Sequence, residues 1–523
     1  MTGGYDVVEV SVATLAADMA AGKVTSEALV LAYQARIEAI DWAGPELRSV
    51  IALNPRALDE ARALDAERRA GKLRGALHGV PILVKDNIDT DDGTATTAGS
   101  LALAANVTLR DAPVVRRLKD AGAVVIGKTN LSEWANIRSR FSISGWSGVG
   151  GLTKNPYVLD RGAAGSSSGT GTAIAASLAA AGVGTETDGS DTAPSSFAGL
   201  AGLKPTVGLV SRAHIIPISH SQDTPGPMAR SVADAAMLLT AMAGTDPDDP
   251  ATAEADARRT DYLSALTGAT LLGKRLGVLS WATKLRPDVD AVFDAAVARL
   301  KAEGAEVVVI EFTPPETLGR DEHLVLMTEL KAGLNAYLAT MPAEVACRTL
   351  TDVIAFNRAT PRELALFGQE LLEKAEATPG LSDPAYQKHR ADSLRAAGVE
   401  GIDKLLAEHR LDALIAPSYG PAGRIDVVGG DHGLGRSSIL PAISGYPHLT
   451  VPMGQLRGLP VGLSFIGPAW SEAALLALGH AFELATRARR PPTYLATLED
   501  GAEIAAALTP AVPARTMRAS TKT

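Results

Sequence analysis

The sequence predicts an α/β fold whose strands form one mostly parallel sheet. Apolar runs that are too short for helices alternate with segments in which apolar residues recur at helical spacing. Two units, residues 80–127 and residues 274–310, each show the order strand, helix, strand. Strands that are joined through a helix usually pair in parallel, so this alternation favours the α/β class.

The first 75 residues are expected to form helices that pack outside the sheet. Apolar residues recur at helical spacing from Leu29 to Ile40. A further helix is expected to begin at Asn54-Pro55, because asparagine caps helices and proline fits their first turn, and to end at Gly71. No strand is expected in this part of the chain.

Residues 76–317 are expected to hold the catalytic core and most of the sheet. The first unit contains a buried strand, a helix and a second strand, at Val80–Val84, Pro113–Ala121 and Ala123–Gly127. The second unit repeats this order, with strands at 275–279 and 306–310 around an amphipathic helix. Both units are expected to join the same sheet.

Strand signals vanish between residues 318 and 398, where helical stretches such as Leu324–Leu338 and Pro361–Ala375 dominate. We expect a helical insertion here. Strands return at Leu411–Pro417 and Leu449–Pro452, so residues 399–507 are expected to complete the core. The tail, residues 508–523, is rich in Ala, Pro and Arg and is expected to be mobile. Residues 1–523 are thus expected to form a single domain.

The composition excludes several function classes. Hydrophobic residues make up 46% of the chain and charged residues 21%, which is typical of a globular protein with a large core. A net charge of −9, spread along the chain, argues against a nucleic-acid partner. The longest apolar run, near residues 173–183, is too short to cross a membrane. The histidines lack metal-ligand spacing and no nucleotide-binding glycine motif occurs, so neither metal nor cofactor is expected.

The N-terminus and the single cysteine bear on the compartment. Cys347 has no second cysteine to pair with, which excludes an intrachain disulfide. The first residues show no basic region followed by an apolar core, so no secretory signal is expected and a cytoplasmic location is favoured. The sequence leaves the oligomeric state open.

Three polar residues in small-residue surroundings are candidates for chemistry. Ser190 ends the run Gly184-Thr-Glu-Thr-Asp-Gly-Ser190, and such a loop can turn its backbone N–H groups inward to bind an oxyanion. Ser166 lies in a second such loop and could relay a proton. Lys85 ends a buried strand, where desolvation can make a lysine a base. Each alone has an ordinary alternative: a helix cap, a flexible turn and a surface lysine.

Several ordered motifs together resemble the amidase signature family, and the likeness is dense from about Gly79 to Val232. The carrying segments are Val80-Pro-Ile-Leu-Val-Lys85-Asp-Asn87, Gly165-Ser-Ser-Ser-Gly169, Gly184-Thr-Glu-Thr-Asp-Gly-Ser190 and Gly202-Leu-Lys-Pro-Thr206. Within the family, the bacterial peptide amidases are most similar, through Lys128-Thr-Asn-Leu-Ser-Glu-Trp134, Ser144-Gly-Trp-Ser147 and Ile216-Pro-Ile-Ser219. The resemblance implies a large mixed, mostly parallel twisted sheet covered by helices on both faces, with the helical insertion over the active site.

The same resemblance implies the catalytic roles. Lys85 corresponds to the family's catalytic lysine, Ser166 to its relay serine, which follows a cis peptide bond, and Ser190 to its nucleophile. The N–H groups of the nucleophile loop would form the oxyanion hole; these belong to Thr187, Asp188, Gly189 and Ser190. No cofactor is implied.

Substrate contacts are expected from the helical insertion and its surroundings. We expect Trp146, Phe356 and Phe367 to line the acyl or leaving-group pocket. Asp191, where the family usually has an aliphatic residue, either opposes the oxyanion, pairs with a base such as Arg212, or binds a cationic substrate amine; we expect it to face away from the oxyanion and to act on the substrate side.

Three functions remain open from the sequence. The first is hydrolysis of a peptide C-terminal amide or an amino-acid amide through an acyl-enzyme. The second uses the same residues on aryl amides, carbamates (urethanes) or esters. The third is an inactive amidase-like subunit of a transamidation complex. Thr192 stands where many relatives carry an arginine that can hold an anionic group, so a neutral acyl portion fits better.

Overall fold

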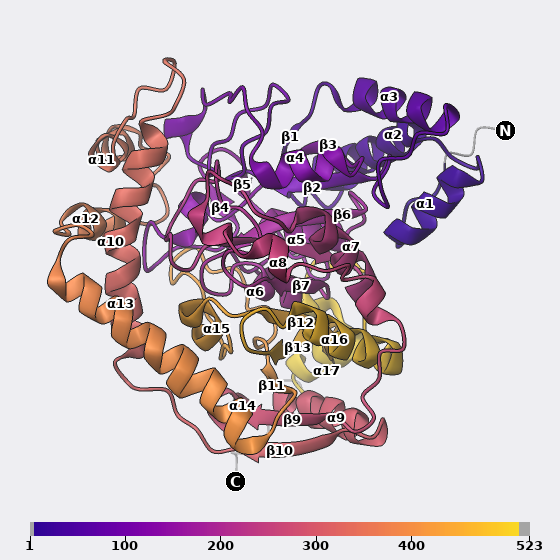
Figure 1. Cartoon of the computed structure of the whole chain (residues 1–523), viewed down its shortest axis with the longest axis vertical. Helices are drawn as coiled ribbons and strands as arrows, with labels where there is room; N and C mark the ends of the chain where they lie inside the picture. The colour runs from indigo at the N-terminus through magenta and orange to yellow at the C-terminus, as the bar shows by residue number, and fades with distance from the viewer. Residues whose placement is uncertain (1–4, 512–523) are drawn as a thin grey trace, which may run out of the picture.

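An 11-stranded mixed sheet forms the centre of the chain (Figure 1). The computed structural model describes residues 5–511. In spatial order the strands are β1 (Val50–Leu53), β3 (Val124–Thr129), β2 (Pro81–Lys85), β6 (Ala181–Glu186), β8 (Thr224–Ala229), β7 (Ala201–Lys204), β12 (His448–Leu456), β13 (Leu459–Ile466), β11 (Ala413–Pro417), β9 (Arg275–Leu279) and β10 (Glu306–Ile310). A separate two-stranded sheet pairs β4 (Trp146–Ser147) with β5 (Gly151–Leu152).

The strand directions correct one expectation. Four pairings in the large sheet are parallel, β3–β2, β2–β6, β11–β9 and β9–β10, and the other six are antiparallel. Both predicted strand–helix–strand units are parallel and lie in this one sheet. The expectation of a mostly parallel sheet was wrong because β8, β7, β12 and β13 are antiparallel to their neighbours. A tight turn at Arg457-Gly458 joins β12 to β13, with φ of 51° and 82°.

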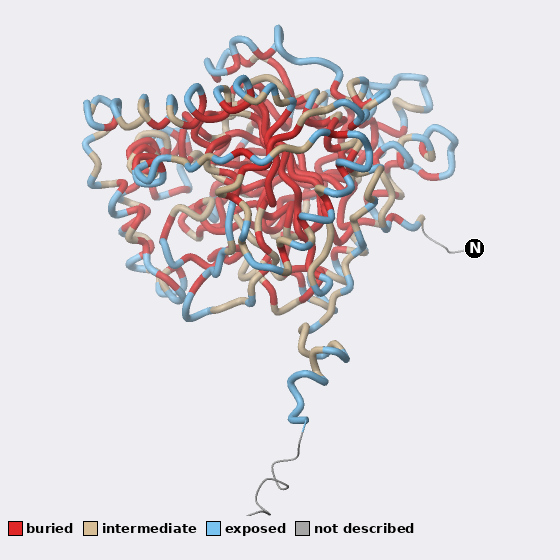
Figure 2. Tube along the Cα trace, turned by 90° about the horizontal axis from the view of Figure 1, so that it is seen from below, coloured by how far each residue is buried: buried red, intermediate tan, exposed pale blue. Residues whose placement is uncertain are grey.

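The central strands of the sheet are buried on both faces. Every residue of β2, β3, β6, β8 and β13 is buried. Because successive side chains of a strand point to opposite faces, the centre of the sheet is covered on both faces, as expected. The buried core is visible in the middle of Figure 2.

Most helices lie where the sequence pattern predicts them. Their bounds are α1 (Val12–Ala20), α2 (Ser26–Arg36), α3 (Ala57–Arg69), α4 (Pro113–Asp120), α5 (Ser168–Ala175), α6 (Thr192–Phe197), α7 (Val232–Met242), α8 (Ala255–Arg258), α9 (Pro287–Ala302), α10 (Leu318–Leu338), α11 (Leu350–Ala359), α12 (Glu370–Glu376), α13 (Pro384–Ala397), α14 (Lys404–His409), α15 (Ile439–Ser444), α16 (Glu472–Thr486) and α17 (Ala502–Leu508).

Two local expectations were wrong. β1 lies between the N-terminal helices in the sequence and pairs with β3 as an edge strand of the sheet, so the first 75 residues are not purely helical. The helix expected at Pro361–Ala375 is instead divided: α11 ends at Ala359, and α12 begins at Glu370. Residues 512–523 of the predicted mobile tail lie outside the described residues.

The segment from residue 318 to 398 contains helices α10 to α13 and no strand. In Figure 1 these helices run along one side of the molecule. Their apolar residues form a cluster that includes Leu330, Leu334 and Leu372 and that also contains Trp134 and Ile216 from the preceding part of the chain. This segment is therefore packed directly on the loops that carry the candidate site.

Candidate active site

Lys85 ends β2 inside the protein, with 0% of its side chain exposed. Four oxygens surround its Nζ: Oγ of Ser166 at 2.8 Å, Oγ of Ser167 at 3.0 Å, and Oγ1 and the carbonyl oxygen of Thr185 at 2.8 and 3.1 Å. None of these neighbours is a carboxylate. Burial lowers the pKa of Lys85 to about 7, because the ammonium loses its hydration without a direct anionic partner.

Ser166 sits just before α5, where small residues let three chain segments meet. The Gly165-Ser166 peptide bond is cis, as the resemblance implies. The carbonyl oxygen of Ser166 accepts a hydrogen bond from the N–H of Ser132 at 3.0 Å. A side chain at Gly165 would collide with Ser132 and Ser144. Glycine at this position is therefore required to hold Ser166 against Lys85.

Ser190 lies in the tight turn between β6 and α6 and is 8% exposed. Its carbonyl oxygen accepts a hydrogen bond from the N–H of Ser167 at 3.1 Å, which ties the two serine loops together. Gly189 supplies the turn with a φ of +83°. The structure thus brings Lys85, Ser166 and the Ser190 loop together, although the described residues contain no direct hydrogen bond between the hydroxyls of Ser166 and Ser190.

The backbone N–H groups of the Ser190 loop are unused. Within residues 5–511, no hydrogen bond is donated by the N–H of Thr187, Asp188, Gly189 or Ser190. Buried backbone donors are almost always paired in folded proteins, so the free donors of the buried Thr187, Gly189 and Ser190 indicate a place for an acceptor. This is the arrangement that a developing oxyanion requires.

Side chains on both sides hold this loop in shape. Oγ1 of Thr187 donates to Asp223 at 2.6 Å, and Asp188 pairs with Arg436 at 2.7 Å. Oε2 of Glu186, which is buried, accepts the N–H groups of the two residues that begin α6 at 2.8 and 2.9 Å. The loop is therefore fixed without any of its own N–H groups.

Asp191 does not lie where the sequence suggested. Its side chain is 0% exposed, lines no described cavity, and accepts a hydrogen bond from Oγ of Ser167 at 2.9 Å. Arg212, its suggested partner, pairs instead with Asp249 at 2.7 Å. The expectation that Asp191 contacts substrate was wrong, because the carboxyl group points into the interior behind the serines.

The three aromatic candidates for the substrate pocket also point elsewhere. Trp146 and Phe367 pack edge to face, with ring centroids 5.2 Å apart, and both stack on the guanidinium of the buried Arg138. Phe356 packs against the apolar cluster of α10 to α12. None of these rings lines any of the three described cavities, so this expectation was wrong.

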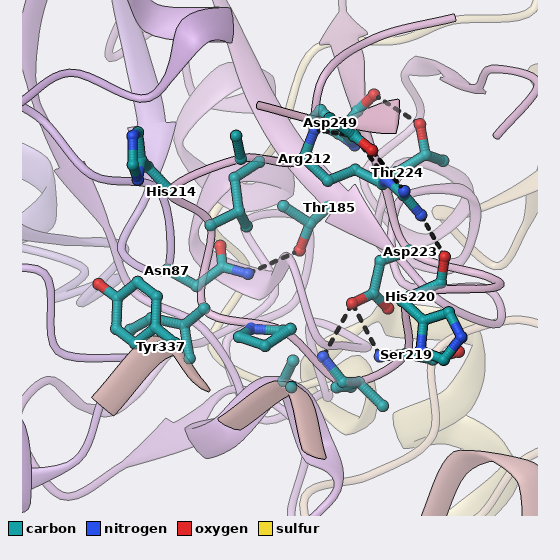
Figure 3. A pocket seen from close by; sticks show the side chains of 18 of the residues that line it. Asn87, Thr185, Arg212, His214, Ser219, His220, Asp223, Thr224, Asp249 and Tyr337 are labelled. Atoms are coloured by element: carbon teal, nitrogen blue, oxygen red, sulfur yellow. Dashed lines mark hydrogen bonds and ion pairs between the residues drawn. The ribbon is translucent and has the colours of Figure 1, made fainter. Parts of the chain in front are cut away.

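A cavity of about 420 Å³ opens beside the Ser190 loop (Figure 3). Thr185, whose hydroxyl is bound to Lys85, and Thr187 form part of its wall. Asn87 joins them and donates to Oγ1 of Thr185 at 3.0 Å. Further lining comes from the apolar run Ile215–Ile218 and from Gly333, Ala336 and Tyr337 on α10. Thr185 therefore separates the cavity from Lys85. Thr187, whose N–H belongs to the candidate oxyanion site, is itself part of the cavity wall.

Two charged groups in the cavity wall, Arg212 and Asp223, are already paired. Nε and Nη2 of Arg212 donate to the carboxylate of Asp249 at 2.8 and 2.7 Å. Asp223 accepts from the backbone N–H groups of Ile218 and Ser219 at 2.8 and 2.9 Å, and burial raises the pKa of this carboxyl group. The cavity thus combines the apolar surface of Ile215–Ile218 and α10 with the paired charges of Arg212 and Asp223.

No role was predicted for Thr185 or Asp223, and Ile216-Pro-Ile-Ser219, which is part of the cavity wall, was used only as a likeness to the peptide amidases. Thr185 lies inside the Ser190 motif, and only its hydroxyl group marked it as a possible polar contact in the site. Asp223 and the Ile215–Ile218 wall come from a long connection between β7 and β8, whose position depends on the antiparallel centre of the sheet.

Within the described part of the chain, no helix is both long and apolar enough to cross a membrane.

Comparison with known proteins gives one consistent family. The family model described as Amidase matches residues 28–476. The solved structure of native peptide amidase from Stenotrophomonas maltophilia is 53% identical, has a TM-score of 0.88 and is covered over 99% of its length, against 93% of this chain. A peptide amidase in complex with the competitive inhibitor chymostatin is also 53% identical, with a TM-score of 0.90 and coverage of 94% of this chain and 100% of that one.

A protein of Arabidopsis thaliana described as a probable amidase is 42% identical over 489 residues, which are 91% of this chain and 89% of the relative. The family model spans well over half of the chain, and the fold is shared along nearly its whole length with peptide amidase structures. Lys85 is buried, and the peptide bond before Ser166 is cis, while the catalytic roles of these residues stay predictions. The chain belongs to the amidase signature family, and its structure is similar to those of peptide amidases.

Proposed function

We propose that this amidase hydrolyses carboxamide bonds through an acyl-enzyme formed on Ser190. The observation that carries the proposal is the 2.8 Å contact between Nζ of Lys85 and Oγ of Ser166 in the protein interior. A lysine there, without a direct carboxylate partner, can be the neutral base that a serine nucleophile needs.

The proton path follows the contacts around Lys85. Neutral Lys85 takes the proton of Ser166 as Ser166 takes the proton of Ser190, and Oγ of Ser190 attacks the carbonyl carbon. Reversal of the relay protonates the leaving amine, and the acyl-enzyme remains. Water then repeats the sequence as the attacking group and releases the acid.

The oxyanion is expected to bind the free N–H groups of the Ser190 loop. The loop is fixed by Asp223, Arg436 and Glu186 before any substrate arrives. Preorganised donors of this kind stabilise the transition state more than the ground state, and loss of one donor typically costs about 10²–10³ in rate.

The proposed substrate is a C-terminal peptide amide or an amino-acid amide. The cavity beside Thr187 supports an acyl portion with apolar side chains, because Ile215–Ile218 form part of its wall and the charges of Arg212 and Asp223 already have partners. The solved peptide amidases at 53% identity point to the same class. Aryl amides, carbamates and esters remain the second candidate, since they present the same carbonyl group to Ser190.

A substrate panel with mass detection tests the proposal. Peptide amides, amino-acid amides, anilides, carbamates and esters are incubated with the wild-type protein and with Ser190→Ala, and a fluorophosphonate probe measures acylation of both. We expect the amides to be cleaved fastest and the probe to label only the wild type. Absence of labelling and of turnover would favour an inactive amidotransferase-like subunit, whereas labelling of Ser190→Ala would place the nucleophile elsewhere.

A further inference from the structure

A third serine links the lysine to a buried acid. Oγ of Ser167 lies 3.0 Å from Nζ of Lys85 and 2.9 Å from Oδ1 of Asp191. It also accepts the N–H of Thr185 at 3.2 Å. With two donors directed at its oxygen, the hydroxyl proton of Ser167 is left for Asp191, so the three side chains form one hydrogen-bonded chain.

Asp191 occupies a sealed space that glycines create. Gly184 on β6 and Gly226 on β8 pair across the two strands. A side-chain carbon at Gly184 would collide with Oδ1 of Asp191, and one at Gly226 would lie 2.5 Å from Oδ2. Within the described residues Oδ2 has no hydrogen-bond partner. In this part of the chain, the Ser167 hydroxyl is therefore the one hydrogen-bond partner found for this buried carboxyl group.

The charged neighbours make a lone carboxylate unfavourable at this position. Glu186 and Asp223 are buried nearby, and the buried Lys204 is, with Lys85, a cation that acts on Asp191. Burial and the adjacent Glu186 raise the pKa of Asp191 well above its usual range, while Lys85 and Lys204 act in the opposite direction. The hydrogen bonds of Ser167 connect the carboxyl group of Asp191 to the Lys85 ammonium. The charge of Asp191 can therefore be neutralised by this ammonium or by a proton.

We propose that Asp191 is a positioning residue for Lys85 and exchanges a proton with it through the Ser167 hydroxyl. The proposal rests on the proposed role of Lys85 as base. A proton moves from Nζ to Oγ of Ser167 while the proton of Ser167 moves to Oδ1 of Asp191. An ammonium and a carboxylate become an amine and a carboxylic acid, with no proton lost to solvent.

The neutral amine then becomes available to the relay. Rotation about the Cε–Nζ bond turns its lone pair toward Ser166, 2.8 Å away. The Ser167 hydroxyl has a second acceptor, the carbonyl oxygen of Thr185 at 3.1 Å. Asp191 in its ionised form does the reverse and holds the proton on Lys85, so this acid sets the pH at which the base becomes free.

The first test is the pH dependence of kcat/KM in Asp191→Asn and Asp191→Ile. Both replacements remove the anion that favours protonated Lys85. We expect the acid limb to move to lower pH by about one unit in each, the low end of what a nearby opposite charge does. Asp234→Asn, at another buried aspartate, is the matched control and should leave the limb in place. An unmoved limb, or one moved to higher pH, in both Asp191 variants overturns the proposal.

The second test observes the proton directly. Infrared difference spectra, wild type minus Asp191→Asn, should contain a carboxylate band in the pH range of the acid limb, because the shift of that limb requires an ionised Asp191; a protonated acid throughout this range also overturns the proposal. Asp191→Ile repeats the comparison if the asparagine variant folds poorly. Lys85→Ala distinguishes failure of the proposed function from failure of the role of Asp191. Full activity of Lys85→Ala refutes the proposed function. An inactive Lys85→Ala, together with an unmoved limb in the Asp191 variants, refutes only the role of Asp191.

Discussion

Two buried cations, Lys85 and Arg138, lie in very different surroundings. Nζ of Lys85 contacts hydroxyl and carbonyl oxygens. Arg138 is equally buried but pairs with Glu133 at 2.6 Å and Glu363 at 3.3 Å. Two aromatic rings flank its guanidinium, with the ring centroid of Phe367 4.2 Å away.

The difference separates a chemical site from a structural one. Carboxylates keep the Arg138 cluster ionic, and arginine cannot give up its proton in a protein. Hydroxyl groups leave Lys85 free to lose its proton and can pass one on. The direct partners of a buried cation, rather than its burial alone, indicate which role it has.

The largest expected effect is loss of activity in Lys85→Ala. Without the base, Ser166 and Ser190 keep their protons, so kcat should fall by about 10⁴ or more. Ser190→Ala should abolish turnover, and Ser166→Ala should retain a small residual rate. Measured kcat values for the three variants check this. Near-normal turnover by Lys85→Ala would show that Lys85, like Arg138, has no chemical role.

Arg138→Met should affect stability rather than chemistry. It leaves Glu133 and Glu363 as buried acids without a cation, which typically costs about 3–5 kcal/mol of unfolding free energy. Urea denaturation measures the loss, with Lys85→Ala as the control whose midpoint should change little. An Arg138→Met protein as stable as the wild type would show that the cluster contributes no net stability.

The pH dependence of the wild type should follow Lys85. Its pKa is lowered to about 7, and the base is active only when deprotonated, so kcat/KM should be constant above this pKa and fall tenfold per pH unit below it. A pH–rate profile, with folding checked at each pH, tests the sign. A rate that stays constant down to pH 5 would exclude Lys85 as the base.

The smallest expected effect is on substrate choice. A side-chain carbon at Gly333 would lie 3.1 Å from Cγ of Pro217 across the cavity. Gly333→Val should therefore raise KM for amides with large acyl groups by up to about tenfold and spare small ones. Gly319→Val, on the same helix but outside the cavity lining, is the control. Equal effects of both variants would mean that the cavity does not hold the substrate.

Local patterns predicted the strands around Lys85 and the loops of Ser166 and Ser190. A fully apolar run with Lys85 at its end, and glycines beside each serine, carry their structural meaning within a few residues. The antiparallel centre of the sheet was not predictable in this way, because β7 pairs with β12 across nearly half of the chain, from Lys204 to His448.

The side-chain directions that were wrong depend on distant partners. Arg138 draws Trp146 and Phe367 into a core because Glu363, far along the chain, supplies its second carboxylate. Asp191 turns inward because Gly226, on a strand that follows a long connection, leaves room for it. Neither partner is marked by any local pattern.

The glycine pair beneath Asp191 also bears on how such an enzyme can change over generations. A space bordered by Gly184 and Gly226 is shaped by backbone, so it accepts a carboxyl group or an aliphatic side chain of similar size without a second substitution. A single codon at position 191 can then move the working pH of the enzyme while the nucleophile, the loop and the substrate cavity stay as they are.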